Sequence, residues 1–180
     1  MEKNKLSTKE LCTISVWAAI IAVMAQIAIP MPAGVPMTMQ TFGITLAALI
    51  LGPKKGAIAT LIYVLLGIVG LPVFANFTGG IDKLVGPTGG FIVSFPLMAW
   101  IIGLGMAYKE RFKWAYVGGI ILGTFINYIV GVIGFCFLTG GAVEVGISAC
   151  VLPFIPTAII KATVAGILGL KLRQRLVHLV

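Results

Sequence analysis

Charge is what this 180-residue sequence has least of. Asp, Glu, Lys and Arg together make up 10% of it, against about 25% in an ordinary soluble domain. Hydrophobic residues make up 59%, and the mean hydropathy is +1.12. Five acidic and thirteen basic residues are too few to cover the surface of a soluble domain of this size. Disorder is excluded by the same hydrophobicity. A small multi-pass membrane protein remains.

The sequence also lacks the residues that most catalytic sites need. Its only histidine is His178, and its three cysteines form no Cys-x-x-Cys pair. None of its acids falls inside an expected span; they are Glu2, Glu10, Asp82, Glu110 and Glu144. The segment 52–56 lacks the spacing of a phosphate loop. We therefore expect no enzyme, no metal site, no cofactor and no nucleotide hydrolysis within this chain, so uphill transport would need another subunit.

Long uncharged runs predict an all-α integral membrane fold. The first run, Leu11–Pro53, is long enough for two spans and is interrupted by Pro30, Pro32, Gly34 and Pro36. The runs are continuous rather than alternating, which argues against a β-barrel. The chain is expected to be one membrane domain, 1–180, with six spans at about 11–29, 38–51, 56–74, 89–108, 114–138 and 147–170.

The basic residues predict the orientation of this bundle. Eleven of the thirteen fall in four segments that six spans would place on one side: the two termini, Lys54–Lys55 and Lys109–Lys113. By the positive-inside rule, that side and both termini are cytoplasmic. The bases are too scattered for a nucleic-acid surface, so no nucleic-acid partner is expected.

Lys161 is an exception because it falls within the last span. It precedes Lys171 by ten residues, about 15 Å along a helix, so its side chain cannot easily reach the cytoplasmic interface. A charge at this depth is expected to face a cavity and to have a partner. An anionic ligand would be a suitable partner; the alternatives are a neutral lysine, or one bonded to carbonyls freed at Pro153 and Pro156.

Two loops on the expected outer side are candidates for closing a pocket. The glycine-rich loop 74–90 offers hydrogen-bonding side chains together with Phe74 and Phe77. The uncharged, proline-rich segment Pro30–Met37 suits a lid and leads into Gln40. Each loop could instead be a simple connector. Together with Lys161, they predict an outward-facing pocket for a small, mostly apolar molecule with one negative charge.

Small residues spaced four apart indicate close helix contacts. Gly119, Gly123 and Gly131 lie in one row with Asn127. Ala18 and Ala22 form a similar pair in the first span, which is the best candidate for a surface that docks another membrane subunit.

Several motifs, taken in order, resemble the BioY family. They are Val35-Pro36-Met37-Thr38-Met39-Gln40-Thr41-Phe42, Leu51-Gly52-Pro53-Lys54-Lys55-Gly56, Tyr63-Val64-Leu65-Leu66-Gly67, Gly70-Leu71-Pro72-Val73-Phe74-Ala75 and Gly86-Pro87-Thr88-Gly89-Gly90-Phe91. BioY proteins are the biotin-binding S components of energy-coupling factor (ECF) transporters. One departure stands out: the last helix of the family usually reads Pro-x-Asp-x-x-Lys, and here Ala158 replaces the acid before Lys161.

The resemblance implies high-affinity biotin capture at the outer face of the cell membrane. It implies a transmembrane coupling subunit and cytoplasmic ATPases as partners, docked through Ala18 and Ala22. The residues it would place against the ligand are Gln40, Asn76, Lys83, Thr88, Tyr128 and Lys161. Its lid loops would contain Val35, Pro36, Met37, Phe77 and Thr78. The alternatives are an S component for another small anionic vitamin and a solitary secondary carrier.

Overall fold

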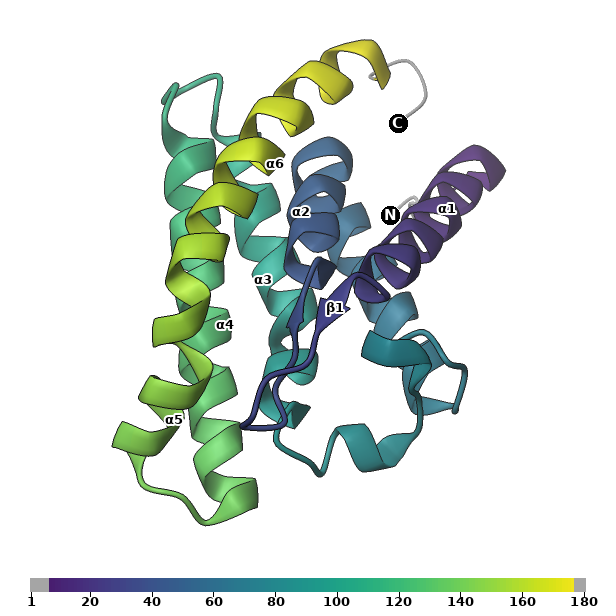
Figure 1. The fold of residues 1–180 in the computed structure, drawn as a ribbon. Coiled ribbons are helices and arrows are strands. Elements are labelled where there is room, and N and C mark those ends of the chain that lie inside the picture. The colour runs from purple at the N-terminus through teal and green to yellow at the C-terminus, as the bar shows by residue number, and fades with distance from the viewer. Residues whose placement is uncertain (1–6, 177–180) are drawn as a thin grey trace, which may run out of the picture.

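The computed structural model describes residues 7–176, which form a helical bundle with very little strand (Figure 1). Lys3, Lys5 and His178 lie outside the described residues. The helices are α1 (Thr8–Ala25), α2 (Gln40–Ile68), α3 (Gly89–Ala107), α4 (Ala115–Thr139), α5 (Val143–Cys150) and α6 (Ile155–Leu176). Strands β1 (Ala28–Ile29) and β2 (Met37–Thr38) pair antiparallel, and η1 (Ala75–Phe77), η2 (Ile81–Lys83) and η3 (Leu152–Phe154) are 3-10 turns. Five helical stretches in the described part are long and apolar enough to cross a membrane. The predicted class, a helical membrane protein, is confirmed.

Helix α1 starts where its sequence provides a cap. The Ser7 hydroxyl accepts a hydrogen bond from the Glu10 backbone N–H at 3.2 Å, and the Glu10 carboxylate accepts one from the Ser7 N–H at 2.8 Å. This reciprocal capping box satisfies two backbone donors at the helix N-terminus. The helix ends at Ala25, earlier than the expected 29, because Ala28 and Ile29 pair with β2 instead.

Helix α2 reverses direction in its middle. Gly52 has φ 81° and ψ −175°, outside the helical region, and Pro53 follows it. A Cβ atom on Gly56 would lie 2.9 Å from the Cα of Ala48. In a straight helix these residues would be about 12 Å apart along the axis. The two halves of α2 therefore fold back on each other, with the break where the sequence placed it.

The first half of α2 is the centre of the bundle. Every residue from Phe42 to Leu51 is buried, and α2 packs against α1, α3 and α6. A helix that is apolar on all sides is stable only when it is surrounded. This explains why a run too short for an ordinary span forms a well-packed central helix.

The row of glycines in α4 packs against α3. Gly119, Gly123, Asn127 and Gly131 are all buried, as predicted. A Cβ on Gly105 of α3 would lie 2.8 Å from the Cα of Gly119, so the two backbones approach closely there. The small residues let the helices touch without side chains between them.

The last expected span, 147–170, is divided in the structure. Helix α5 ends at Cys150, the 3-10 turn η3 contains Pro153, and α6 begins at Ile155. Proline removes a backbone donor and its ring clashes with the preceding turn, which favours a break here. As a result, Lys161 lies near the start of α6 rather than in the middle of a continuous helix.

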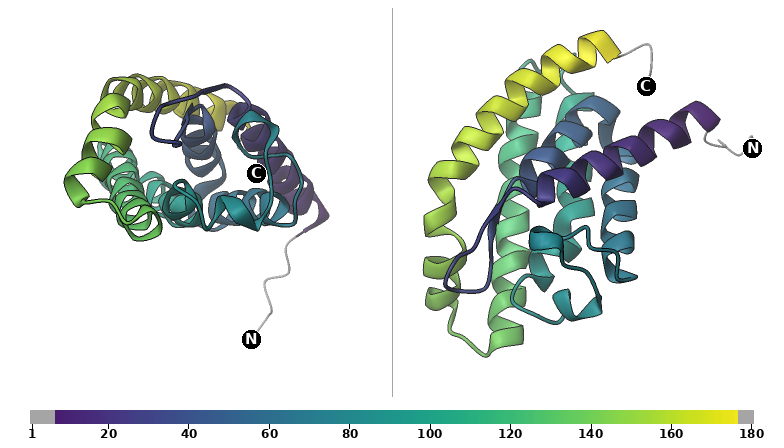
Figure 2. Two further views of the ribbon diagram at one scale, coloured as in Figure 1. Left: turned by 60° about the horizontal axis from the view of Figure 1, so that its bottom comes forward. Right: turned by 45° about the vertical axis from the view of Figure 1, so that its right-hand side comes forward.

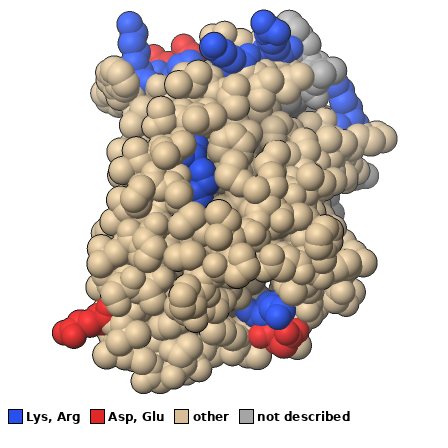
Figure 3. All heavy atoms as spheres, viewed as in Figure 1, with Lys and Arg blue, Asp and Glu red and all other residues tan. Residues whose placement is uncertain are grey.

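Charged groups gather at one end of the molecule (Figure 3). Figures 1 and 2 place the start of α1, the loop between α3 and α4 and the end of α6 at this end. Lys55 forms an ion pair with Glu10 at 2.9 Å, and Arg173 donates to the carbonyls of Leu49 and Ile50 at 2.9 and 3.0 Å. These contacts fasten α1 and α6 to the turn of α2. The tip of the 26–39 segment and the 69–88 loop lie toward the opposite end (Figure 1).

Candidate ligand-binding site

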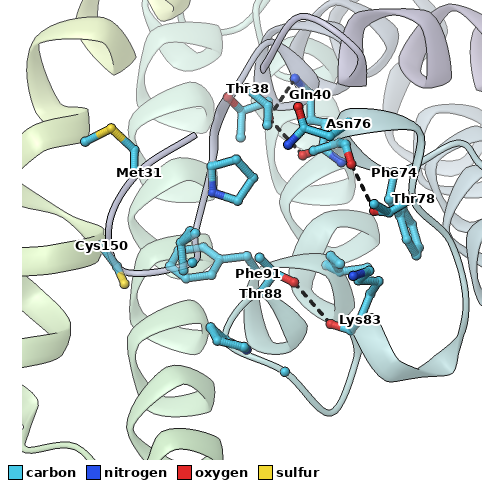
Figure 4. Close-up of a pocket in the computed structure, with 18 of the residues that line it drawn as sticks. Met31, Thr38, Gln40, Phe74, Asn76, Thr78, Lys83, Thr88, Phe91 and Cys150 are labelled. Atoms are coloured by element: carbon cyan, nitrogen blue, oxygen red, sulfur yellow. Dashed lines mark hydrogen bonds between the residues drawn. The ribbon is translucent and has the colours of Figure 1, made fainter. Parts of the chain in front are cut away.

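A cavity of about 390 Å³ lies at the end of the bundle where the two long loops meet (Figure 4). Its walls come from the 30–38 segment, the start of α2, the 74–88 loop, α3, α4, η3 and α6. Most of the lining is apolar, with a few polar side chains among it. This size and composition are typical of pockets for small organic ligands, which measure about 300–1,000 Å³.

The structure brings the six predicted ligand-contacting residues to this one cavity. The residues are Gln40, Asn76, Lys83, Thr88, Tyr128 and Lys161, and all of them line it. They come from four separate parts of the chain. In Figure 4, Thr38, Gln40 and Asn76 lie on one side of the cavity, and Lys83, Thr88 and Phe91 lie on another.

The predicted lid residues divide into two groups. Val35, Pro36 and Thr78 line the cavity. Met37 does not line it; this residue is partly buried and packs against the core. Phe77 does not line it either, and this residue is 72% exposed. Only three of the five predicted lid residues therefore line the cavity.

Gln40 is held in place by two neighbouring hydroxyl groups. The Thr38 hydroxyl donates to its Oε1 at 2.8 Å, and its Nε2 donates to the Tyr63 hydroxyl. Tyr63 is fully buried, and its ring packs edge-on against Phe74 with centroids 5.7 Å apart. Gln40 is itself buried, so its amide presents a fixed hydrogen-bonding pattern at the cavity wall.

Asn76 lies in a backbone conformation that is unusual for side-chain-bearing residues. Its φ is 57° and that of Phe77 is 55°. Asparagine tolerates this left-handed region better than most residues, whereas phenylalanine does so rarely. The turn is fixed by a bond from the Phe74 N–H to the Thr78 carbonyl at 2.8 Å. It is also fixed from α1, since Gln26 Oε1 accepts from the Phe77 N–H at 2.8 Å.

Lys161 joins α6 to β2 and to the start of α2. Its Nζ donates to the Thr38 carbonyl at 3.0 Å and to the Thr41 hydroxyl at 3.1 Å. No ion pair with an acid is formed by this lysine within residues 7–176. One of the sequence-based alternatives, a carbonyl partner, is therefore present, but Thr38 supplies it rather than the turns at Pro153 and Pro156. Lys83, by contrast, pairs with the neighbouring Asp82 at 3.4 Å.

Several lining residues were not among the predicted contacts. Phe91, Phe95 and Phe154 supply apolar wall, and Cys150 also lines the cavity. Nothing in the sequence distinguishes these from the many other apolar residues of the spans. Asn127 did carry a signal, because it interrupts the glycine row of α4. Its amide donates to the Phe91 carbonyl at 3.1 Å and to the Ser94 hydroxyl at 2.7 Å.

The predicted docking pair on α1 faces the interior. Ala18 is 2% exposed, and Ala22 packs partly buried against the core. The outer face of α1 includes Ser15, Ala19 and Val23 instead. The four-residue spacing of an alanine pair does not indicate whether the pair faces the interior or the outside of a bundle. Here the pair packs against the interior.

In the part of the chain that the structure describes, membrane-length helices surround a large, mostly apolar cavity. This arrangement is typical of a membrane-embedded ligand-binding protein. The chain belongs to the BioY family, whose profile matches residues 1–178. This membership makes the chain a transport protein and not an enzyme, and it calls for no cofactor.

The similarity to known members extends over nearly the whole chain. The biotin transporter BioY of Thermotoga maritima is 42% identical over 92% of this chain and 96% of that protein. A probable biotin transporter BioY of Pyrococcus horikoshii is 38% identical over 93% and 98%. The crystal structure of the S component for biotin from an ECF-type ABC transporter has a TM-score of 0.83 and 27% identity, covering 97% of this chain and 95% of that chain.

Proposed function

We propose that this protein captures biotin with high affinity on the outer side of the cell membrane, as the substrate-binding subunit of an ATP-driven ECF transporter. The observation that carries the proposal is the cavity of about 390 Å³ that contains all six predicted contacts, in a chain of the BioY family. Biotin has an apolar bicyclic body, a ureido group and a carboxylate, and the cavity offers a complement to each.

The chemistry of the walls supports an arrangement for the ligand. Phe91 and Phe95 give apolar surface for the bicyclic body. Gln40 and Asn76 have amide groups that can both donate to and accept from a ureido group. The ammonium of Lys161 has a third donor beyond its two bonds, which suits a carboxylate. Lys83 is the alternative partner, although Asp82 already neutralises it in part.

The proposed topology has six spans with both termini cytoplasmic. The two halves of α2 would count separately, and α5 with α6 would form the last span. The basic end of the bundle would face the cytoplasm, and the cavity end would face outward. A transmembrane coupling subunit would then contact the exposed face of α1 around Ser15 and Ala19. Cytoplasmic ATPase subunits would supply the energy.

The first test is equilibrium binding of labelled biotin to the purified protein in detergent, with Lys161→Met and Lys171→Met compared. Both changes remove an ammonium from α6 and leave a side chain of similar length, but Lys171 is exposed beyond the cavity. We expect Lys161→Met to weaken biotin binding about tenfold or more, because a charged hydrogen bond contributes about 1.5–3 kcal/mol. Binding of the uncharged biotin amide should change much less. Lys171→Met should leave both affinities unchanged.

Three results would contradict the proposal. Absence of saturable biotin binding would refute the ligand, and a second small anionic vitamin that binds more tightly than biotin would replace it. Equal losses for biotin and its amide would refute the pairing of Lys161 with the carboxylate. Biotin uptake into cells that is unchanged without the coupling subunits would indicate a solitary carrier.

A further inference from the structure

A second, much smaller cavity lies next to Lys161. Its volume is about 20 Å³, and it shares Thr41, Asn127, Tyr128 and Lys161 with the main cavity. The rest of its wall includes Thr124 of α4 and Ala158 of α6. A cavity needs about 10–15 Å³ to hold one water-sized occupant. The space therefore suits a single water molecule or a small ion.

Most of the polar groups around this small cavity can donate a hydrogen bond. Lys161 has three N–H groups and uses two of them, on the Thr38 carbonyl and the Thr41 hydroxyl. Because Thr41 accepts that bond through its oxygen, its own hydrogen is available. The hydroxyls of Thr124 and Tyr128 make no hydrogen bond to any described residue. The carbonyl oxygen of the Asn127 amide is an acceptor, and no carboxylate lines the space.

The charge of Lys161 in its protonated form distinguishes between the two kinds of occupant. A cation among membrane-spanning helices is costly unless an opposite charge compensates it. Within residues 7–176, the two ion pairs join Glu10 to Lys55 and Asp82 to Lys83, and neither includes a residue of α6. Water would satisfy the donors but would leave the charge uncompensated. An anion would do both.

We propose that the small cavity is a binding site for a small monovalent anion of the halide class, such as chloride, which neutralises Lys161 when no organic ligand is bound. The site does not depend on the identity of that ligand. If the ligand carries a carboxylate to Lys161, two anions would share one ammonium and would repel each other. Chloride would then oppose ligand binding, and ligand binding would release chloride.

The chain offers a variant that places an anion in the site permanently. Ala158 lines the small cavity and precedes Lys161 by three residues, so side chains at the two positions meet on one helix face. The Ala158→Asp change would supply a carboxylate where we place chloride. Thr124→Val removes one hydroxyl donor and keeps the shape of the side chain. Thr163→Val is the matched control, because Thr163 is exposed on α6 and bonds only to the Ile159 carbonyl.

The experiment measures the melting temperature of the ligand-free protein in detergent as sodium gluconate is replaced by sodium chloride or bromide at constant ionic strength. We expect a saturable rise in the original protein and in Thr163→Val, since a ligand that binds only the folded state stabilises it. Thr124→Val should need more halide for the same rise, and Ala158→Asp should show none. Crystals grown with bromide should give an anomalous peak within hydrogen-bond distance of Lys161 Nζ.

Two outcomes would overturn the proposal. One is a melting temperature independent of halide, with no anomalous peak beside Lys161, which would assign the cavity to water. The other is the same halide dependence in the original protein and in Ala158→Asp, which would place the effect elsewhere on the surface. Because this experiment does not use biotin, a negative result would refute the anion site without bearing on the proposed transport function.

Discussion

At the residue scale, single side chains far apart in sequence fix the groups that line the cavity. Gln26, at the end of α1, accepts from the Phe77 N–H at 2.8 Å and donates to the Val73 carbonyl at 3.2 Å. These bonds hold the 73–77 turn in which Asn76 has its left-handed conformation. Together with the bond from the Phe74 N–H to the Thr78 carbonyl, they offset the cost of keeping two consecutive residues at positive φ. Gln26 therefore acts on the site through Asn76, without lining the cavity itself.

Gln26→Leu should consequently loosen this turn. We expect the dissociation rate of labelled biotin to rise several-fold and the free energy of unfolding to fall by about 1–2 kcal/mol, the cost of leaving a partner unsatisfied. Stopped-flow dissociation and thermal melting in detergent measure the two effects. Gln174→Leu is the matched control, because Gln174 is exposed on α6 and should change neither value. If both variants dissociate biotin at the original rate, Gln26 has no role in holding the turn.

The sequence predicted the polar residues of the cavity better than the apolar ones, and the reason is physical. A lysine, glutamine or asparagine in an otherwise apolar span has a cost that some contact must offset, so its presence is informative. A phenylalanine such as Phe91 can face lipid, a neighbouring helix or a ligand at similar cost, so its presence does not indicate which of them it contacts. The side of α1 on which Ala18 lies was likewise undetermined, because alanine suits both an internal contact and an exposed one.

At the element scale, close helix packing sets the shape of the cavity. Gly131 of α4 lies directly beneath the ring of Phe91, and a Cβ there would be 2.2 Å from the Phe91 Cε1. Phe91 belongs to α3 and lines the cavity. Because Gly131 of α4 has no side chain, the ring of Phe91 on α3 can occupy its position at the cavity wall.

Gly131→Ala should then disturb the cavity through Phe91. The added methyl group must displace the ring or separate α3 from α4, at a cost of about 1–3 kcal/mol for overpacking. We expect a lower melting temperature and weaker biotin binding. Gly118→Ala, in the same helix, is the control, because nothing lies within 4 Å of its Cβ position. It should be neutral or stabilising by up to about 1 kcal/mol, as alanine favours helix. Equal effects of the two changes would contradict this account of the α3–α4 contact.

The helices themselves were predictable to different degrees. The bounds of α3 and α4 agree with the expected 89–108 and 114–138 within a residue at each end, because glycine and charged residues mark both limits. The break between α5 and α6 was less predictable. The hydrophobic run continues through Pro153, and only packing against the rest of the bundle decides whether a proline bends a helix or ends it. The position of Lys161 near the start of α6 follows from that break.

At the scale of the whole molecule, charge separates the two ends. Helix α4 has 25 residues, about 37 Å of helix, which is enough to cross a membrane. Glu110 lies in the loop before it, among Lys109, Arg111 and Lys113. Glu144 lies just after it, at the start of α5. Both acids are exposed, so they mark opposite ends of one helix.

These two positions allow a direct test of the proposed orientation. In a protein with Cys12→Ser, Cys136→Ser and Cys150→Ala, single cysteines are introduced as Glu110→Cys or Glu144→Cys. A membrane-impermeant maleimide should label Glu144→Cys on intact cells and Glu110→Cys only after the membrane is opened, because the basic loop is retained in the cytoplasm. Retained biotin binding by both variants ensures that the folded protein is measured. The opposite labelling pattern would invert the topology and turn the cavity toward the cytoplasm, where it could not capture an external ligand.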